Sequence, residues 1–195
     1  MSNKHIIIFG PPGSGKDTQV GLLLEQYPEL MELSTGKMLR ALAKEDQRLA
    51  KLLSAGSLEH TSDQANLLVE EKLEVTDNKV ILYNGYPRTI EQFEILINLL
   101  QKSDGVVEIA LILLDVSDQE VIKRLTIQDR GRSDDRIEII KYRLNLYQEY
   151  TQAVINRAQV DTNSDILSIN GERPIEDINQ DIVQYLVGQG YIHGA

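Results

Sequence analysis

The amino-acid sequence predicts an α/β protein with a doubly wound parallel sheet of five strands and helices on both faces. Short β-branched runs alternate along the chain with segments in which apolar residues recur at helical spacing. The runs are apolar on both alternations, as expected of parallel strands that helices cover on both sides. A chain of 195 residues can bury one such core with small insertions. We therefore expect one core rather than two large domains.

Five runs are the expected strands. They read HIIIF, MELS, KVILY, VVEIALILLDV and DILSI, and their strand positions are residues 6–9, 31–34, 79–83, 106–116 and 166–169. Apolar residues at helical spacing predict amphipathic helices over residues 20–27, 90–100 and 175–185, and one long helical face over residues 137–158. In a doubly wound sheet the ligand site lies at the carboxyl ends of the strands. We therefore expect the site in the loops after Phe9, Ser34, Tyr83 and Val116.

Composition argues against several classes of function. The formal charge of -10 and the pI near 4.8 are opposite to the broad basic field of a nucleic-acid reader. No apolar run approaches the ~18 residues of a membrane helix, and the N-terminus has no secretory pattern. The chain has no cysteine, which fits a reducing cytoplasm and excludes thiolate zinc sites. We expect a cytoplasmic protein without nucleic-acid or membrane partners, and a monomer because the sequence has no obvious exposed apolar stripe.

The strongest motif is the glycine-rich turn GPPGSGK, which follows the first expected strand. Gly10 is followed by four residues and then by Gly15 and Lys16, which matches the phosphate-binding pattern G-x-x-x-x-G-K. Such glycines let consecutive backbone N–H groups face a phosphate, the next helix adds its dipole, and the lysine reaches the outer phosphates. Glycines that merely turn the chain would explain neither the lysine nor the spacing. The motif therefore predicts a P-loop NTPase fold.

The segment LYNGYPRTIEQ carries residues suited to a second phosphate and to a base. Gly85 and Pro87 shape a tight turn, and Arg88 begins a helix that presents Gln92 four residues later on the same face. An arginine can bind a phosphate with two hydrogen bonds, and a glutamine amide can pair with a base edge. A solvated arginine and glutamine on a surface helix is the alternative interpretation.

The segment LSTGKMLR begins the helix after the second expected strand. Ser34 and Thr35 both belong to the residue types that cap helices, so capping alone is one interpretation of Thr35. Arg40 follows five residues later, where it could meet a second anionic group at the entrance of the helix.

Arginines are concentrated in one part of this acidic chain. Five of the ten arginines lie within 20 residues, at Arg124, Arg130, Arg132, Arg136 and Arg143. A transferring phosphoryl group spreads negative charge over its oxygens, so converging arginines stabilise its transition state. The cluster favours phosphoryl transfer, and a surface ladder of ion pairs is the alternative.

Together these segments resemble the signature set of adenylate kinases, in the nucleoside monophosphate kinase family. The matching segments are GKDTQ, STGKMLR and NGYPRTIEQ, and the similarity runs from about Lys4 to Leu186. UMP/CMP kinases usually carry alanine and asparagine where this chain has Thr35 and Gln92, so AMP is the expected acceptor. The resemblance implies reversible, Mg²⁺-dependent phosphoryl transfer from ATP to AMP, which gives two ADP. A UMP/CMP-type kinase and a nucleotide-binding relative that has lost catalysis are the alternatives.

The resemblance also implies roles for individual residues. ATP contacts are expected from the phosphate loop and from residues beside the adenine, namely Gly10, Pro12, Gly13, Ser14, Gly15, Lys16, Asp17, Thr18, Arg124, Gly171 and Arg173. AMP contacts are expected from Thr35, Gly36, Arg40, Gly85, Arg88 and Gln92. The residues expected to act on the transferred phosphate are Lys16, Arg88, Arg132, Arg143 and Arg130. Arg130 would substitute from a different register, because Gln128 stands where relatives have an arginine.

The same resemblance divides the chain into three parts. The expected core comprises residues 1–33, 64–126 and 138–195, with a small helical AMP-binding insertion at residues 34–63 and a short lid at residues 127–137. The segment GRSDD is similar to the short-lid form. Zinc-bearing long lids use cysteines, which this chain lacks, so no zinc is expected.

Two positions depart from the family pattern near the expected magnesium site. Asn84 stands where relatives usually carry an aspartate that holds Mg²⁺ through water, and Asp17 stands where they usually carry glycine. Our hypothesis is that the acidic group has moved across the site, so that Asp17 serves Mg²⁺ beside Asn84. The alternative is that Asp17, in the first turn of a helix, only complements the helix dipole, which is worth about 0.3 to 1 kcal/mol.

Overall fold

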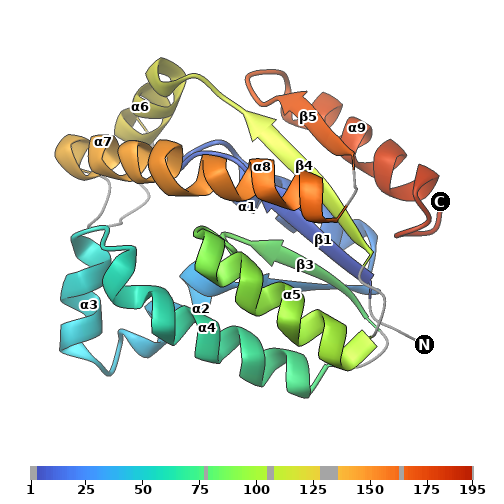
Figure 1. Cartoon of the computed structure of the whole chain (residues 1–195). Coiled ribbons are helices and arrows are strands. Elements are labelled where there is room, and N and C mark those ends of the chain that lie inside the picture. Colours follow the sequence, from blue (N-terminus) through green and yellow to red (C-terminus); the bar gives the residue numbers. More distant parts are fainter. Residues whose placement is uncertain (1–3, 77–78, 105–107, 128–135, 163–164, 195) are drawn as a thin grey trace.

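The computed structural model describes residues 4–76, 79–104, 108–127, 136–162 and 165–194. Within these residues, five parallel strands form one sheet in the order β2-β3-β1-β4-β5 (Figure 1). The strands are β1 (Lys4–Phe9), β2 (Leu30–Ser34), β3 (Val80–Asn84), β4 (Ile109–Asp115) and β5 (Ile166–Asn170). Because the chain adds strands on both sides of the central β1, the predicted doubly wound parallel sheet is confirmed.

The central strand β1 is buried along most of its length. Ile6 and Ile7 are fully buried, and Ile7 lies opposite Tyr83 of β3 and Leu111 of β4. A strand in this position faces helices on both sides, which explains why it is apolar at the consecutive positions from Ile6 to Phe9 rather than at alternate ones. The fourth expected strand is shorter than predicted: β4 begins at Ile109 and ends at Asp115, and residues 106–107 lie outside the described residues.

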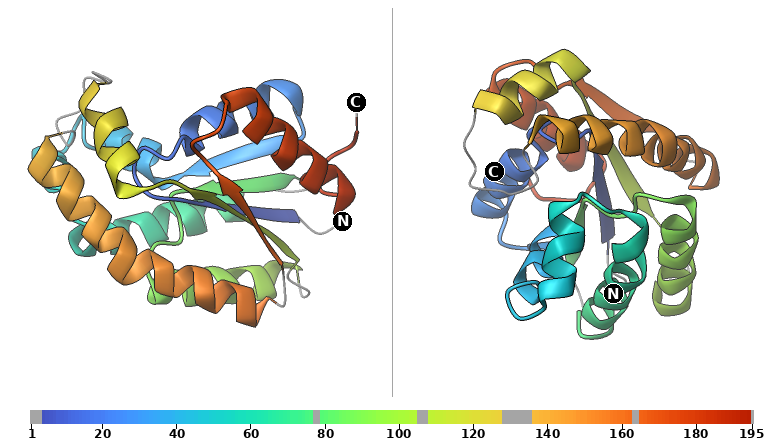
Figure 2. Two further views of the ribbon diagram at one scale, coloured as in Figure 1. Left: turned by 90° about the horizontal axis from the view of Figure 1, so that it is seen from above. Right: turned by 90° about the vertical axis from the view of Figure 1, so that its left-hand side faces the viewer.

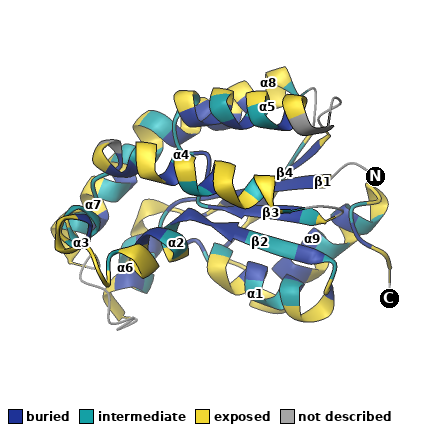
Figure 3. Cartoon of the chain, turned by 90° about the horizontal axis from the view of Figure 1, so that it is seen from below, coloured by how far each residue is buried: buried dark blue, intermediate teal, exposed yellow. Residues whose placement is uncertain are grey.

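Two layers of helices cover the sheet (Figure 2). One face packs against α1 (Lys16–Gln26) and α9 (Ile175–Gly188), and the other against α4 (Glu59–Glu74), α5 (Ile90–Asp104) and α8 (Gln152–Asp161). Figure 3 shows buried strands between helices whose outer sides are exposed. This three-layer arrangement, with helices on both faces, confirms the architecture expected from the sequence.

Smaller helical parts flank the carboxyl ends of the strands, at the left of Figure 1. Helices α2 (Thr35–Leu42) and α3 (Gln47–Ser54) pack with α4 around a cluster of their own, which contains Leu39, Leu49 and Ala65. Helices α6 (Asp118–Ile127) and α7 (Ile137–Leu146) form another cluster. Asp46 caps α3, because its carboxylate accepts hydrogen bonds from the N–H groups of Arg48 and Leu49.

A π-helical turn, η1 (Tyr147–Thr151), joins α7 to α8 in one long helix. The face predicted over residues 137–158 is confirmed at Ile140, Leu144, Val154 and Ala158, which are all buried. Ile137 is 43% exposed instead, because it is the first residue of α7 and lies outside the cluster that joins α7 to α6. None of the helices in the described part of the chain combines the length and apolar content that a membrane crossing requires.

Candidate active site

A cavity of about 800 Å³ lies at the carboxyl ends of the strands, where the fold class predicted it. Its lining includes the segments after Phe9, Ser34 and Tyr83, so three of the four expected loops meet there. In the described residues, the segment after Val116 reaches the cavity through Arg124 of α6 rather than through the loop itself. All the expected ATP and AMP contacts that the sequence named line this one cavity.

The phosphate loop joins β1 to α1 and adopts the backbone conformation that its glycines predicted. Gly13 and Gly15 have positive φ angles of 77° and 95°, which residues with a side chain adopt rarely. A Cβ at Gly10 would lie 2.7 Å from Ser14 Oγ and 2.8 Å from the Leu114 carbonyl oxygen, so this position has no room for one. Lys16 Nζ lies across the loop, where it donates to the Gly10 and Pro11 carbonyls at 2.6 and 2.8 Å. The ammonium group of Lys16 therefore lies at the opening of the phosphate loop.

The Gly85 carbonyl joins the second and third loops. It accepts hydrogen bonds from Thr35 Oγ1 at 2.9 Å and from Arg88 Nε at 2.8 Å. Capping does not account for Thr35, because the N-cap of α2 is Ser34, whose hydroxyl accepts from the Lys37 N–H. Gly85 has a φ of 78°, and a Cβ there would lie 2.8 Å from a terminal nitrogen of Arg88. The guanidinium therefore packs directly against the glycine.

Gln92 is buried rather than solvated, which rules out the surface-helix interpretation for this residue. It is 2% exposed and lies in the first turns of α5. Its Oε1 accepts from the Arg88 backbone N–H at 2.8 Å, and its Nε2 donates to Ser62 Oγ of α4 at 2.9 Å. The hydroxyl of Tyr86 lies 3.1 Å from the Gln92 carbonyl, and burial raises the pKa of this tyrosine well above its usual range.

Asn84 links two carboxylates at the end of β3. Its side chain is buried, and Nδ2 donates to Asp17 Oδ1 at 2.8 Å and to Glu32 Oε1 at 2.9 Å. Glu32 also forms an ion pair with Lys37 at 2.6 Å. The structure thus brings Asp17 and Asn84 together, as the hypothesis of a moved acidic group requires, and adds Glu32. Asp17 also lies in the first turn of α1, so the dipole interpretation applies to it as well.

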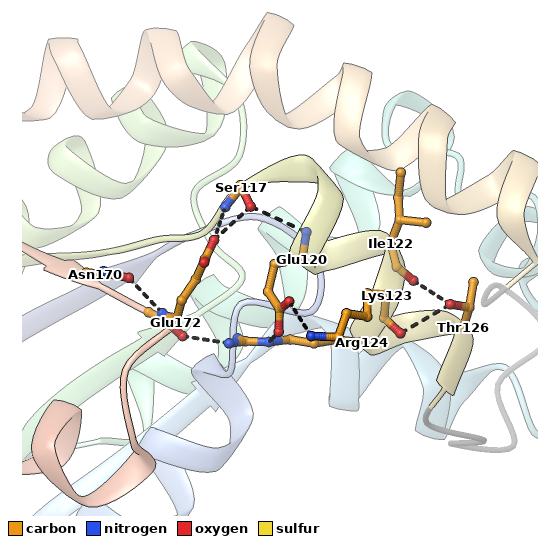
Figure 4. Close-up of polar contacts among 9 residues, drawn as sticks. Ser117, Glu120, Ile122, Lys123, Arg124, Thr126, Asn170 and Glu172 are labelled. Carbon is orange, nitrogen blue, oxygen red and sulfur yellow. Dashed lines mark hydrogen bonds and ion pairs between the residues drawn. The ribbon is translucent and has the colours of Figure 1, made fainter.

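Arg124 connects α6 to the loop after β5 (Figure 4). One terminal nitrogen donates to the Gly171 carbonyl at 3.0 Å, and Nε donates to Glu120 at 2.9 Å. Hydrogen bonds from Lys123 and then Arg124 lower the pKa of the Glu120 carboxyl. The neighbouring Glu172 accepts from the hydroxyl and then the N–H of Ser117, and these two hydrogen bonds lower the pKa of its carboxyl. Arg173 lines the cavity and pairs with Asp181.

The arginine cluster is only partly within the described residues. Arg143 of α7 lines the cavity beside Gly56, whose added Cβ would lie 3.2 Å from Arg143 Cγ. Arg136 is the exposed N-cap of α7. Arg130, Arg132 and Gln128 lie outside the described residues, as does most of the expected lid at residues 127–137.

The described residues hold no group of three or more His, Asp or Glu side chains that could bind a metal ion.

Several residues that line the cavity or contact its lining were missed from the sequence. Tyr147 and Thr151, interpreted as members of an apolar helix face, both line the cavity from the π-helical turn. Thr151 Oγ1 donates to the Arg88 carbonyl at 3.2 Å, and burial together with Asp115 raises the pKa of Tyr147 to about 12. Ser62 was missed as well, because no apolar periodicity marked the start of α4. Glu32 had one visible signal, since it is a charge between the apolar residues Met31 and Leu33 of a strand.

A parallel sheet with a phosphate loop and a cavity at its carboxyl edge that arginine and lysine side chains line defines a protein of the P-loop NTPase class. The family model for adenylate kinase matches residues 8–162. Among curated relatives, an adenylate kinase of Prochlorococcus marinus (strain MIT 9515) is 38% identical over 93% of this chain and 97% of its own length. An adenylate kinase of Corynebacterium diphtheriae is 36% identical over 90% of this chain and 94% of its own. The chain belongs to the adenylate kinase family.

Proposed function

We propose that this enzyme transfers a phosphoryl group reversibly from ATP to AMP and so forms two ADP. The observation that carries the proposal is the single cavity that the phosphate loop shares with the Thr35, Arg88 and Gln92 segments. One nucleotide bound to the loop and another bound to these segments would direct their phosphates toward each other. Holding two reactants in this way converts a bimolecular reaction into an effectively unimolecular one.

The ATP half of the proposal rests on the phosphate loop and on the loop after β5. The residues proposed to contact ATP are Gly10, Pro12, Gly13, Ser14, Gly15, Lys16, Asp17, Thr18, Arg124, Gly171 and Arg173. Lys16 already lies at the mouth of the loop, so a polyphosphate would take the place of the carbonyl oxygens that now accept from its ammonium group. The N-terminus of α1 adds its dipole to the same anion site.

The AMP half rests on the second and third loops. The residues proposed to contact AMP are Thr35, Gly36, Arg40, Gly85, Arg88 and Gln92. The guanidinium of Arg88 would bind the phosphate, and the Gln92 amide would pair with the base. The shared Gly85 carbonyl holds Thr35 and Arg88 in fixed relation, which supports their assignment to one ligand.

The proposed chemistry needs positioning and charge rather than a general base. The phosphate of AMP is already ionised near neutral pH and can act as the nucleophile on the γ-phosphorus of ATP. Lys16, Arg88 and Arg143 face the cavity and would neutralise the charge that spreads over the transferred group. Arg132 and Arg130 are proposed to join them, and they lie outside the described residues.

We propose that two smaller parts move relative to the core, which comprises residues 1–33, 64–126 and 138–195. The AMP-binding insertion is assigned to residues 34–63, and its Leu39 and Leu49 pack in a separate cluster that also includes Ala65, two residues beyond this boundary. Helix α4 runs continuously across the boundary at residue 63. The lid is assigned to residues 127–137, and its closure would exclude the water that competes with AMP. A monomeric state and a cytoplasmic location remain predictions of the sequence.

Asp17 and Asn84 are proposed to hold the Mg²⁺ of Mg·ATP through water. Carboxylate and amide oxygens are the ligands that Mg²⁺ prefers, so the donor set fits this ion. The positive charge of Lys37 compensates the negative charge of Glu32. The formal charge of these two side chains and Asp17 is therefore about -1, like that of a single aspartate. The bound ion would shield the phosphate oxygens against repulsion during transfer.

An acceptor comparison tests the proposed function. Purified protein, ATP and Mg²⁺ are combined with AMP, UMP or CMP, and formation of nucleoside diphosphate is followed in a coupled assay. We expect turnover with AMP that exceeds turnover with either pyrimidine nucleotide, since Thr35 and Gln92 belong to the adenine-type pattern. Preference for UMP or CMP would favour the UMP/CMP-kinase alternative, and ATP binding without turnover on any acceptor would favour a relative that has lost catalysis.

A further inference from the structure

The carboxamide of Gln92 is engaged at both of its ends. Oε1 accepts from the Arg88 backbone N–H at 2.8 Å, and Nε2 donates to Ser62 Oγ at 2.9 Å. An amide oxygen has two acceptor positions and an amide nitrogen has two hydrogens. Each end therefore keeps one further position, an acceptor at Oε1 and a donor at Nε2, for a ligand in the cavity that Gln92 lines.

The two partners of the amide have different effects. A backbone N–H can only donate, so Arg88 requires the oxygen of Gln92 on its side. Rotation of the amide by 180° would place its NH₂ group against the Arg88 N–H, so that two donors would face each other in a buried position, which is costly. The Ser62 hydroxyl accepts from the nitrogen end and so holds the amide at a defined position. Orientation therefore comes from the main chain, and position comes from Ser62.

An amide fixed in this orientation distinguishes two kinds of purine. The pairing edge of a 6-aminopurine offers a donor at N6 next to an acceptor at N1, whereas a 6-oxopurine offers an acceptor at O6 next to a donor at N1. The free acceptor at Oε1 and the free donor at Nε2 complement the first edge. The second edge would need the rotated amide, and a site with fixed polar groups rejects a ligand that leaves them unpaired.

We propose that Ser62 is a positioning residue that holds Gln92 for the base of the acceptor nucleotide and contributes to the preference for a 6-aminopurine. The inference rests on the proposed function, because it concerns the AMP half of that site. Helix α4 makes a second connection to Gln92, through Tyr86. The Tyr86 hydroxyl lies 3.0 Å from Asn66 Oδ1 and 3.1 Å from the Gln92 carbonyl oxygen. Ser62 and Asn66 are four residues apart, so one face of α4 supports both the side chain and the main chain of Gln92.

The variant Ser62→Ala tests the proposal without impairing the helix, because alanine is a better helix former than serine. Ser54→Ala is the matched control, since Ser54 ends α3 and its hydroxyl donates to Lys51 within the same helix. Ser62→Thr retains a hydroxyl and tests rescue. Steady-state kinetics are measured for each variant with ATP, AMP and inosine monophosphate, and calorimetric binding of AMP gives a comparison that does not depend on turnover.

We expect Ser62→Ala to raise KM and Kd for AMP about 5-fold, the change that loss of one ordinary hydrogen bond produces. The kcat and the KM for ATP should change by less than about 2-fold, because the hydroxyl contacts only the acceptor side. The preference for AMP over inosine monophosphate should narrow, and Ser62→Thr should restore both values. An unchanged or lower KM for AMP, or an equal loss on both purines, would overturn the proposal. A wild-type protein that binds AMP but forms no ADP would instead contradict the proposed function, and the binding comparison would still test Ser62.

Discussion

The buried amide of Asn84 donates a 2.8 Å hydrogen bond to Asp17, the residue that directly follows the phosphate-loop lysine. The same amide group donates to Glu32 at 2.9 Å. An uncharged donor thus stands between two carboxylates at the end of β3. This arrangement supports our hypothesis that Asp17 supplies the acidic group of the proposed magnesium site.

The double-mutant cycle of Asp17→Gly and Asn84→Asp tests this hypothesis. Asp17→Gly should weaken the dependence of turnover on Mg²⁺, because it removes the exposed carboxylate that accepts a hydrogen bond from Asn84. Adding Asn84→Asp should restore much of that dependence, because the acid returns to the end of β3. The measurement is the Mg²⁺ concentration for half-maximal ADP formation in the four proteins. Additive effects would mean that the two positions act independently and that the exchange hypothesis is wrong.

Asn84→Asp alone should reduce the free energy of unfolding by about 1 to 3 kcal/mol. The new carboxylate would replace a donor that now serves both Asp17 and Glu32, so two acceptors would lose their partner beside a third negative charge. Denaturant unfolding measures the change. Asn145→Asp, at an exposed position on α7, is the control and should shift stability by less than about 0.5 kcal/mol. Equal shifts in the two variants would contradict the bridging role of Asn84.

Gly85→Ala should raise KM for AMP in addition to destabilising the fold. Its φ is 78°, and the added Cβ would lie 2.8 Å from a terminal nitrogen of Arg88, so the guanidinium would have to move. Gly190→Ala provides the matched control, because Gly190 has a φ of 71° and its Cβ would meet only Lys4 Nζ at 4.0 Å. Each variant should lose about 1 kcal/mol of stability from the left-handed conformation. Steady-state kinetics should distinguish the two variants, because only Gly85→Ala should raise KM for AMP. A similar KM for AMP in both variants would show that the position of the Arg88 guanidinium does not depend on Gly85.

Arg124→Ala should raise KM for ATP and leave KM for AMP nearly unchanged. The guanidinium donates to the Gly171 carbonyl at 3.0 Å and so holds the loop after β5 beside the phosphate loop. Lys123→Ala is the control, because the adjacent lysine pairs with the same Glu120 but has a side chain that is 65% exposed. Steady-state kinetics with each nucleotide varied in turn decide the matter. A loss for ATP that is equal in the two variants would assign the effect to Glu120 rather than to the cavity.

Acid should weaken the ion pairs that Glu120 forms with Lys123 and Arg124 within α6. The pKa of Glu120 is lowered, first by Lys123 and then by Arg124, so this carboxylate contributes stability above its unfolded pKa and loses it as pH falls through its folded pKa. Glu120→Gln should therefore lower Tm at pH 7, and the difference from the wild type should vanish in strong acid. Thermal unfolding of both proteins from pH 7 down to pH 3 measures this. A difference in Tm that is independent of pH would show that charge is not the cause.

Periodicity and motif spacing predicted the parallel sheet, its two helix layers and the position of the cavity. These features follow from local patterns, because consecutive residues determine the burial of a strand and the turn of a phosphate loop. The contact of Glu32 with Asn84 was not predictable in this way. It depends on β2 and β3 being neighbours, with Ser34 paired to Asn84, and strand order is a property of the whole sheet.

The same reasoning explains what the sequence left open on the acceptor side. Capping of α2 by Thr35 was one interpretation until the structure showed Ser34 as the N-cap and Thr35 bound to the Gly85 carbonyl, because both residues are of types that cap helices. Ser62 became visible only when α4 placed it beside Gln92, which lies 30 residues further along the chain. Tyr147 and Thr151 obeyed the helical period, but the π-helical turn directs them to the cavity.

The central claim is that one cavity binds both nucleotides at once. Titration calorimetry with a bisubstrate compound, two adenosines joined by five phosphates, tests this claim most directly. We expect one molecule per chain and an affinity at least ~10²-fold tighter than that of ATP alone, since linked ligands gain effective concentration. Arg88→Ala and Lys16→Ala, which remove cations from opposite halves of the cavity, should each weaken binding. Two molecules per chain, or tight binding that is indifferent to Arg88→Ala, would contradict the account.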